Sequence, residues 1–229
     1  MAESEFDQHS DSYSEKIGGM IAPFGQGHDF FVRSKADILR PIFATIKEDT
    51  SKLKVLDVGC GVGLVHSYIV DSLGELHGTD ISSASLDVAG RANPHVRYLP
   101  YDGTTLPYER DSFDCAYAIC VMHHVPVPQW HGFLREMRRV VRPGGAIVII
   151  EHNPLNPATQ WVVRTNAMDE NAVLLTPWKL RNLMESVGCN SIWLRYVLFV
   201  PFAGKLARAI DRLLARVPLG TQYVVRGRV

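Results

Sequence analysis

Three alternating glycines, Gly59, Gly61 and Gly63, stand in the segment VLDVGCGVG, directly after an apolar run. Glycine has no Cβ, so the backbone of such a turn, which includes Cys60, can approach a ligand closely. A nicotinamide dinucleotide site would carry the spacing G-x-G-x-x-G, with a helix N-terminus facing the pyrophosphate. Here the spacing is G-x-G-x-G, and Asp57 precedes it. Because this carboxylate would repel a pyrophosphate and attract an ammonium group beside a sulfonium centre, the turn favours S-adenosylmethionine over a dinucleotide.

Two more carboxylates are placed to bind other parts of the same ligand. Asp80 ends the next predicted strand, where an acidic residue can accept hydrogen bonds from both ribose hydroxyls. Ile81, beside it, is placed to pack on the adenine face. The YDG segment follows a third predicted strand, and there Asp102, next to Gly103, can accept the adenine amino group. These positions form the predicted nucleoside half of the site.

Histidines and a glutamate follow the next two predicted strands, in the segments MHHVPVP (122–128) and EHNPLNP (151–157). Ligands of open α/β sheets bind outside the carboxyl ends of the strands, so these side chains should converge at the same edge of the sheet as the predicted cofactor site. Histidine suits proton transfer near neutral pH, and a hydroxyl acceptor benefits from a base. The candidate catalytic residues are His123, His124, Glu151 and His152. The pair could also bind a metal ion, but because no third ligand follows at a recognisable spacing, the sequence predicts no metal site.

These residues lie at the ends of apolar segments that alternate with helical patterns. Such alternation predicts right-handed βαβ units and a parallel sheet. The predicted strands are 53–58, 75–80, 95–100, 113–120, 146–151, 190–200 and 221–229. The predicted helices are 63–73, 82–92, 128–142, 176–188 and 204–217, with Ser82 and Thr176 as N-caps.

The simplest domain organisation is a flexible N-terminal arm over residues 1–28, followed by a single domain over 29–229. Within that domain, residues 29–48 and 152–175 are predicted lid elements. The first is expected to be helical with an interruption at Pro41, and the second to be an irregular loop.

Composition argues against several classes of protein. Hydrophobic residues make up 46% of the 229 residues, which is enough for a sizeable core. The formal net charge is zero, so a nucleic-acid partner is not expected. Four cysteines without a C-x-x-C pair are typical of reduced, buried thiols. Because the polar N-terminal segment lacks a signal-peptide core and no apolar run is long enough to span a bilayer, the sequence predicts a soluble, cytoplasmic protein.

Five features in this order resemble the class I methyltransferase family: the D-x-G-x-G-x-G turn, the acidic end of the second strand, the DG after the third, FD at 113–114 and RPGG at 142–145. Over about residues 50–150 the pattern is similar to the small-molecule branch called methyltransferase type 11. The resemblance implies a Rossmann-like, doubly wound α/β sheet of seven strands, mostly parallel with an antiparallel last strand.

The same resemblance implies roles for individual residues. It places Cys120 against the methionine part of the cofactor, and Lys35, or a neighbour in 28–35, over the cofactor carboxylate. Similar O-methyltransferases use the first histidine of such a pair as the base, helped by an acidic residue after strand five. The expected base is therefore His123, with Glu151 as its helper.

The acceptor is less well defined. The segment after the fourth strand lacks the [DN]PP[YF] signature shared by similar enzymes that methylate base or amide nitrogens, and a His-His pair there is frequent in similar small-molecule O-methyltransferases. We therefore expect O-methylation of a small hydroxylated metabolite, a sugar or a lipid-linked glycan. Transfer to nitrogen or carbon, and a non-catalytic cofactor-binding role, are the alternatives. A nucleotide-dependent oxidoreductase is disfavoured by the glycine spacing.

The segment 204–217 bears an apolar stripe opposite a basic one. The main expectation is a helix that packs on the sheet and exposes its basic face to solvent. The alternative is peripheral contact with an anionic membrane, which would suit a lipid-linked acceptor. The apolar residues are Leu206, Ile210, Leu213, Leu214 and Val217, and the basic ones are Lys205, Arg208, Arg212 and Arg216.

Overall fold

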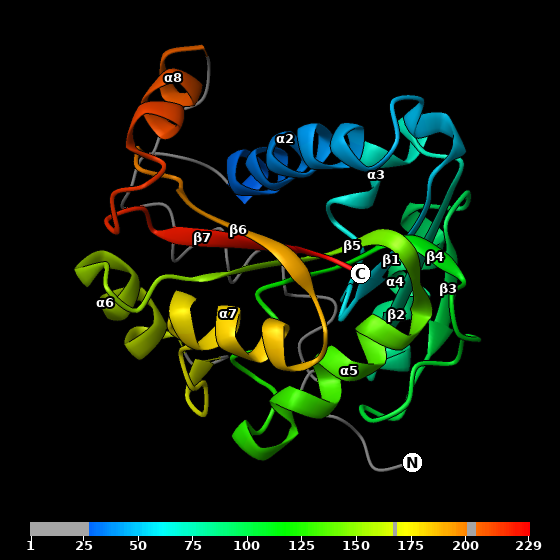
Figure 1. The fold of residues 1–229 in the computed structure, drawn as a ribbon. Coiled ribbons are helices and arrows are strands. Elements are labelled where there is room, and N and C mark those ends of the chain that lie inside the picture. Colours follow the sequence, from blue (N-terminus) through cyan, green and yellow to red (C-terminus); the bar gives the residue numbers. More distant parts are fainter. Residues whose placement is uncertain (1–27, 167–168, 201–204) are drawn as a thin grey trace.

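One sheet runs through the protein, with helices against both of its faces (Figure 1). The computed structural model describes residues 28–166, 169–200 and 205–229, and within them the sheet has seven strands in the order β3-β2-β1-β4-β5-β7-β6. Strands β1 to β5 are parallel, and β7 pairs antiparallel with both β5 and β6. The predicted fold class is confirmed. The strands are β1 (Lys54–Val58), β2 (Glu75–Asp80), β3 (Arg97–Pro100), β4 (Phe113–Ile119), β5 (Val141–His152), β6 (Asn190–Val197) and β7 (Gln222–Arg228).

Helices cover the two faces of this sheet with separate apolar clusters. On one face, α2 buries Ala36, Leu39 and Phe43 against the strands. On the other, α5 and α7 contribute Met137 and Met184 to the larger cluster. The α-helices are α2 (His28–Ile46), α3 (His66–Ile69), α4 (Ser83–Ala92), α5 (Trp130–Val140), α6 (Pro157–Thr165), α7 (Pro177–Ser186) and α8 (Lys205–Leu214). Short 3-10 helices are η3 (Thr50–Lys52), η4 (Val70–Ser72) and η5 (Val127–Gln129).

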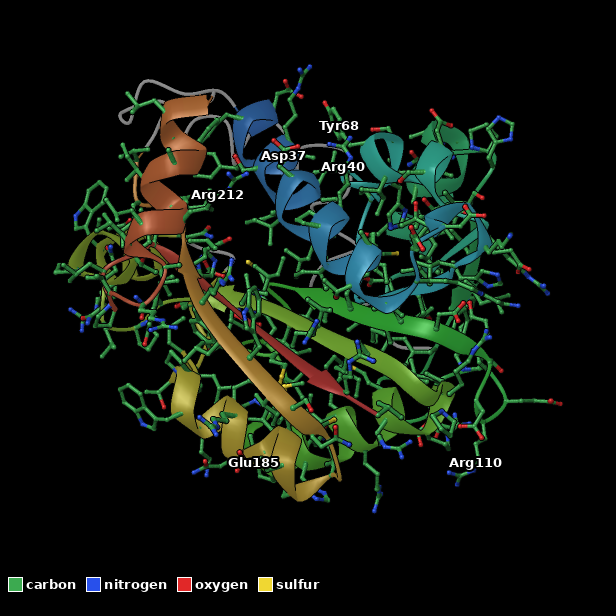
Figure 2. All side chains as sticks on the ribbon, turned by 45° about the horizontal axis from the view of Figure 1, so that its top comes forward. Asp37, Arg40, Tyr68, Arg110, Glu185 and Arg212 are labelled. Atoms are coloured by element: carbon green, nitrogen blue, oxygen red, sulfur yellow. The ribbon has the colours of Figure 1, made fainter. Side chains whose placement is uncertain are left out.

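Helix α2 is also tied to its neighbour on the same face. Arg40 donates to the Asp37 carboxylate at 2.8 Å and to the Tyr68 carbonyl, in α3, at 2.6 Å. Figure 2 shows these three residues together on the outer side of the two helices. The contact fixes α2 relative to the segment that follows the glycine-rich turn.

The expected interruption at Pro41 is wrong, because α2 is assigned as one helix from residue 28 to residue 46. Proline in a helix interior costs about 3 kcal/mol, since it removes one hydrogen bond and crowds the preceding turn. Leu39, Ile42 and Phe43 are all buried beside it, and each contributes roughly 1.5–3 kcal/mol on burial. The buried face therefore outweighs the cost of the proline. Of the predicted arm, residues 1–27 lie outside the described part of the chain.

The predicted irregular loop over 152–175 instead contains α6. The Asn156 side chain accepts a hydrogen bond from the Thr159 backbone N–H, and Pro157 stands at the first helical position. An N-cap followed by proline is a helix-start pattern that the sequence did contain. The capping predictions for Ser82 and Thr176 are confirmed. Other boundaries differ: α5 ends at Val140 and β5 already begins at Val141, so RPGG lies inside a strand.

Helix α8 packs differently from the main expectation. Leu206 and Leu213 are 66% and 83% exposed, whereas Ala207 and Ala215 are buried. Asp211 holds the helix to the end of β6 by accepting hydrogen bonds from the backbone N–H groups that follow it, at 3.1 and 3.4 Å. Part of the apolar stripe therefore faces outward, because an aspartate and small residues make the contact. Among the described helices, none has the length and apolarity required to cross a membrane.

Candidate active site

A cavity of about 670 Å³ opens at the carboxyl ends of β1, β2, β4 and β5. Parallel strands place their carboxyl ends at one edge, which is why residues far apart in sequence meet here. Most of the predicted site residues line it: Lys35, Asp57, Gly59, Cys60, Gly61, Asp80, Ile81, Gly103, Cys120, His123, His124 and His152. Gly63, Asp102 and Glu151 do not line it.

The glycine-rich turn shows why two of its positions need glycine. Gly59 has φ +76°, and a Cβ there would lie 2.6 Å from a methyl carbon of Val121. Gly61 has φ +52°, and a Cβ there would meet no described protein atom within 4 Å. Gly61 also lines the cavity, so its missing side chain leaves space for a ligand rather than for the protein.

The Asp80 carboxylate is held in place by the backbone. Its Oδ2 accepts from the Gly61 N–H at 2.8 Å, and its Oδ1 accepts from the Ser82 N–H at 2.9 Å. Burial raises the pKa of Asp80, while these two hydrogen bonds oppose that effect. Each carboxylate oxygen retains a lone pair. Ile81, beside it, is 45% exposed, as expected of a side chain that would be covered by the flat adenine ring of a bound cofactor.

Asp57 offers a second fixed carboxylate. The imidazole of His66 lies 2.9 Å from Asp57 Oδ2, and its other nitrogen lies 2.6 Å from the Tyr98 hydroxyl. Asp57 Oδ1 is buried, and no hydrogen-bond partner for it is found among the described residues. A buried acceptor without a partner at a cavity wall fits a cationic ligand group, and S-adenosylmethionine carries an ammonium group. The residues present therefore fit this cofactor.

Cys120 directly follows β4 and lines the cavity. Its φ is +54°, a strained value for a residue with a Cβ. Gln222 Nε2 approaches Cys120 Sγ at 3.2 Å, and Lys35 Nζ approaches it at 3.9 Å from α2. Burial raises the pKa of Cys120, so the group is a neutral thiol. The location of Lys35 is compatible with its predicted role toward the cofactor carboxylate, which stays a prediction.

Three histidines and two carboxylates form one group beside Cys120, which we call the histidine–carboxylate cluster: His123, His124, His152, Glu151 and Asp169. Glu151 Oε2 lies 2.6 Å from His123 Nδ1, and Glu151 Oε1 accepts from the Met122 N–H at 2.7 Å. Asp169 Oδ1 lies 3.5 Å from His123 Nε2 and 3.4 Å from His124 Nε2. The centroids of the His123 and His152 rings are 5.1 Å apart. Glu151 is thus a buried partner of His123 rather than a cavity residue.

Charge is unevenly distributed within this cluster. Burial by itself lowers the pKa of His123, but the negative charge of Glu151 and the contacts with Asp169 and Glu151 outweigh it and raise that pKa to about 10. Burial and the positive charge of His123 lower the pKa of His124 to about 4. The same two causes lower the pKa of His152 to about 4. At neutral pH His123 is therefore the cation, and the two neutral imidazoles belong to His124 and His152. The ranking of His123 as the base stays a prediction, and this distribution of charge does not favour it.

Two predicted cofactor residues lie away from the cavity. Asp102 is exposed, and its Oδ1 accepts hydrogen bonds from the N–H groups of Thr104 and Thr105 within its own turn. Gly63 packs against the Tyr98 hydroxyl, which would lie 2.7 Å from a Cβ at that position. Their assignment to the cofactor stays a prediction.

Several cavity residues were not predicted from the sequence: Tyr101, Asn166, Asp169 and Gln222. Tyr101 adjoins the YDG segment, so its position was a usable signal. Asp169 follows α6, in a segment expected to be a lid, and no local spacing connects it to the histidines. Gln222 is the polar first residue of a strand, directly before three apolar residues, and this break in the apolar pattern was the available signal.

Comparisons with known proteins agree with this geometry. A family model described as a methyltransferase domain matches residues 56–149. Methyltransferase GfsG of Streptomyces halstedii is 38% identical over 105 residues, which are 43% of this chain and 37% of that protein. The chloroplastic tocopherol O-methyltransferase of Arabidopsis thaliana is 28% identical over 175 residues, which are 71% of this chain and 45% of that protein. The chain thus spans less than half of the length of these two relatives.

The fold is shared with a solved structure as well. A SAM-dependent methyltransferase from Archaeoglobus fulgidus superposes with a TM-score of 0.63 at 15% identity, over 85% of this chain and 94% of that one. The matched family model, the sheet order and the fixed carboxylates of the cavity together support a class I methyltransferase fold over this part of the chain, with S-adenosylmethionine as the cofactor that the cavity fits.

Proposed function

We propose that this protein transfers a methyl group from S-adenosylmethionine to a hydroxyl of a small or lipid-linked acceptor. The observation that carries the proposal is the position of the histidine–carboxylate cluster. Four of its residues, His123, His124, His152 and Asp169, line the same cavity as the glycine-rich turn, Asp80 and Cys120. A ligand held at the turn would thus present its reactive end to a group able to handle a proton.

The chemistry of methyl transfer explains why such a cluster supports an oxygen acceptor. S-adenosylmethionine supplies an electrophilic methyl group on a sulfonium with a good leaving group. The protein mainly has to align donor and acceptor, and the walls of the cavity can hold both in place. A hydroxyl must also lose its proton, and imidazoles with carboxylate partners are the side chains suited to that step. The relative named tocopherol O-methyltransferase supports the same choice of acceptor atom.

Helix α8 supports a lipid-linked acceptor. Leu206 and Leu213 project outward on the same helix as the exposed Arg212, which Figure 2 labels. Outward apolar residues beside basic ones are typical of a helix that lies in the interface of an anionic membrane. Asp211 of this helix bonds to the backbone of Leu198 and Phe199, and both of these line the cavity. Membrane contact at α8 would therefore bring the cavity close to the lipid surface.

Two measurements test this function. Calorimetry should show binding of S-adenosylmethionine and its demethylated product, S-adenosylhomocysteine, but no binding of NAD. A panel of hydroxylated metabolites and lipid-linked glycans, analysed by mass spectrometry, should then yield a product that has gained one methyl group on oxygen. If His123 serves as the base, His123→Ala should reduce turnover in that assay by about 10²–10⁴-fold and leave cofactor affinity nearly unchanged; if the neutral imidazole of His124 serves instead, His124→Ala should show that loss. Methylation of nitrogen or carbon, or full turnover by both His123→Ala and His124→Ala, would contradict the proposed acceptor.

A further inference from the structure

Two histidines and an aspartate present ligand atoms to one small space in the cavity. One ligand atom from each of His123, His124 and Asp169 lies within 4.8 Å of the others. Asp169 Oδ1 is 3.5 Å from His123 Nε2 and 3.4 Å from His124 Nε2. A charge-assisted N–H···O hydrogen bond is usually about 2.7–2.9 Å long. The two contacts are thus longer than good hydrogen bonds.

These separations instead match the spacing of ligands around a metal ion. Zinc binds histidine nitrogen and carboxylate oxygen at about 2.0–2.2 Å, so two ligands of a tetrahedral site are about 3.3–3.5 Å apart. Both measured contacts to Asp169 Oδ1 lie within or at the edge of that range. An ion bound by the three atoms would therefore leave these two separations nearly unchanged, and the two histidine nitrogens lie within 4.8 Å of each other.

Neighbouring groups hold the ligands in the orientation that a metal requires. Glu151 lies 2.6 Å from Nδ1 of His123, which leaves Nε2 directed at Asp169. A carboxylate on the far nitrogen of a ligating histidine is a common support in metal sites. Asn166 donates to Asp169 Oδ2 at 2.6 Å and so leaves Oδ1 toward the imidazoles. All three ligands line the cavity in which an acceptor would bind.

Two carboxylates face the imidazoles of this group. Glu151 lies beside His123 Nδ1, and Asp169 lies beside both His123 Nε2 and His124 Nε2. Carboxylate oxygen and imidazole nitrogen are both ligands that zinc accepts in proteins.

We propose that His123, His124 and Asp169 bind a divalent transition-metal ion such as Zn²⁺, with Glu151 as the support of His123. The sequence predicted no metal because the third ligand comes from beyond α6. The proposal of a site stands on the geometry of these residues alone. A role for the ion, binding the acceptor hydroxyl and making its proton easier to remove, rests on the proposed function.

Metal titration tests the site without any acceptor. Protein freed of metal with a chelator is titrated with Co²⁺ alone and followed by visible absorption and calorimetry. We expect one equivalent to bind, with the absorption bands of a four- or five-coordinate ion. Glu151→Gln should weaken binding by about 10–100-fold, as loss of a supporting carboxylate does. Asp169→Asn and His124→Gln remove ligands and should weaken it more. His131→Gln, at an exposed histidine of α5, is the matched control and should bind like the wild type.

Each variant is also tested for binding of S-adenosylhomocysteine, which reports that the chain is folded and the cofactor site intact. Absence of a bound equivalent in the wild type would overturn the metal site, and so would an affinity that survives Asp169→Asn and His124→Gln. If the protein binds the cofactor but not Co²⁺, the proposed metal site is wrong and the proposed function is unaffected. If the protein binds Co²⁺ but not the cofactor, the metal site is supported and the proposed function is contradicted.

Discussion

Replacing Asp80 with alanine is the most direct perturbation of the cofactor site. The structure holds its carboxylate with two backbone hydrogen bonds, at 2.8 and 2.9 Å, and leaves one lone pair on each oxygen for a ligand. If both accept a ribose hydroxyl, the variant loses charge-assisted hydrogen bonds to the cofactor. The expected loss is about 1–3 kcal/mol, which corresponds to about 5–150-fold in the dissociation constant.

The assay is calorimetric titration of wild type and Asp80→Ala with S-adenosylhomocysteine. The variant also frees the N–H groups of Gly61 and Ser82, so its melting temperature without ligand must be measured to separate instability from lost contacts. Asp87→Ala, at an exposed position of α4, is the matched control and should bind the ligand with wild-type affinity. An unchanged affinity in Asp80→Ala, with the protein folded, would refute the placement of the ribose at the end of β2.

Two further predictions concern the turn and the outer helix. Gly59→Ala should lower the free energy of unfolding by about 1–3 kcal/mol, because a Cβ would be strained at a φ of +76° and would collide with Val121. A denaturant titration measures this change, and an unchanged midpoint would contradict the close packing of this turn. Leu213→Glu should weaken binding to vesicles of anionic lipid by about 5–30-fold, which corresponds to losing the transfer free energy of a leucine side chain about half inserted into the membrane. The control variant Trp178→Glu, at an exposed position of α7, should bind as the wild type does. Equal binding by both variants would contradict membrane contact at α8.

The parts of the site that could be predicted from the sequence are those fixed by local spacing. The turn from Gly59 to Gly63 and the carboxylate of Asp80 each lie within a few residues of a strand end, so the strand assignment alone locates them. The same reasoning brought His123 and His152 to one edge of the sheet, because parallel strands share that edge. Asp102 shows its limit: the residue is at the expected place in the chain, yet its carboxylate turns back to bond the backbone of Thr104 and Thr105.

The parts that the sequence missed depend on contacts between distant segments. Asp169 contacts the histidines although it lies beyond α6 in the chain, and no motif encodes that contact. Gln222 reaches Cys120 because β7 enters the sheet antiparallel beside β5. The outward leucines of α8 were missed for the opposite reason, since an apolar stripe does not specify which side packs when Asp211 supplies the anchoring hydrogen bonds.

The role of Lys35 gives a prediction that uses the ligand as well as the protein. Its ammonium reaches the cavity from α2, 3.9 Å from the thiol of Cys120, where the methionine part of the cofactor is expected. If it pairs with the cofactor carboxylate, Lys35→Met should weaken S-adenosylmethionine binding by about 5–30-fold, the equivalent of about 1–2 kcal/mol for a charge-assisted hydrogen bond. Decarboxylated S-adenosylmethionine lacks that group, so the same variant should bind it as the wild type does.

Comparing the two ligands separates this pairing from a general effect on the cavity. Lost packing of the lysine stem would weaken both ligands equally, whereas a lost ion pair weakens only the one that carries the carboxylate. Lys47→Met, at the exposed position just beyond the end of α2, is the control for removing a positive charge from this part of the protein. An equal loss of affinity for both ligands in Lys35→Met would contradict the pairing and leave the lysine as a structural neighbour of Cys120, because only a contact with the carboxylate can make the variant discriminate between them.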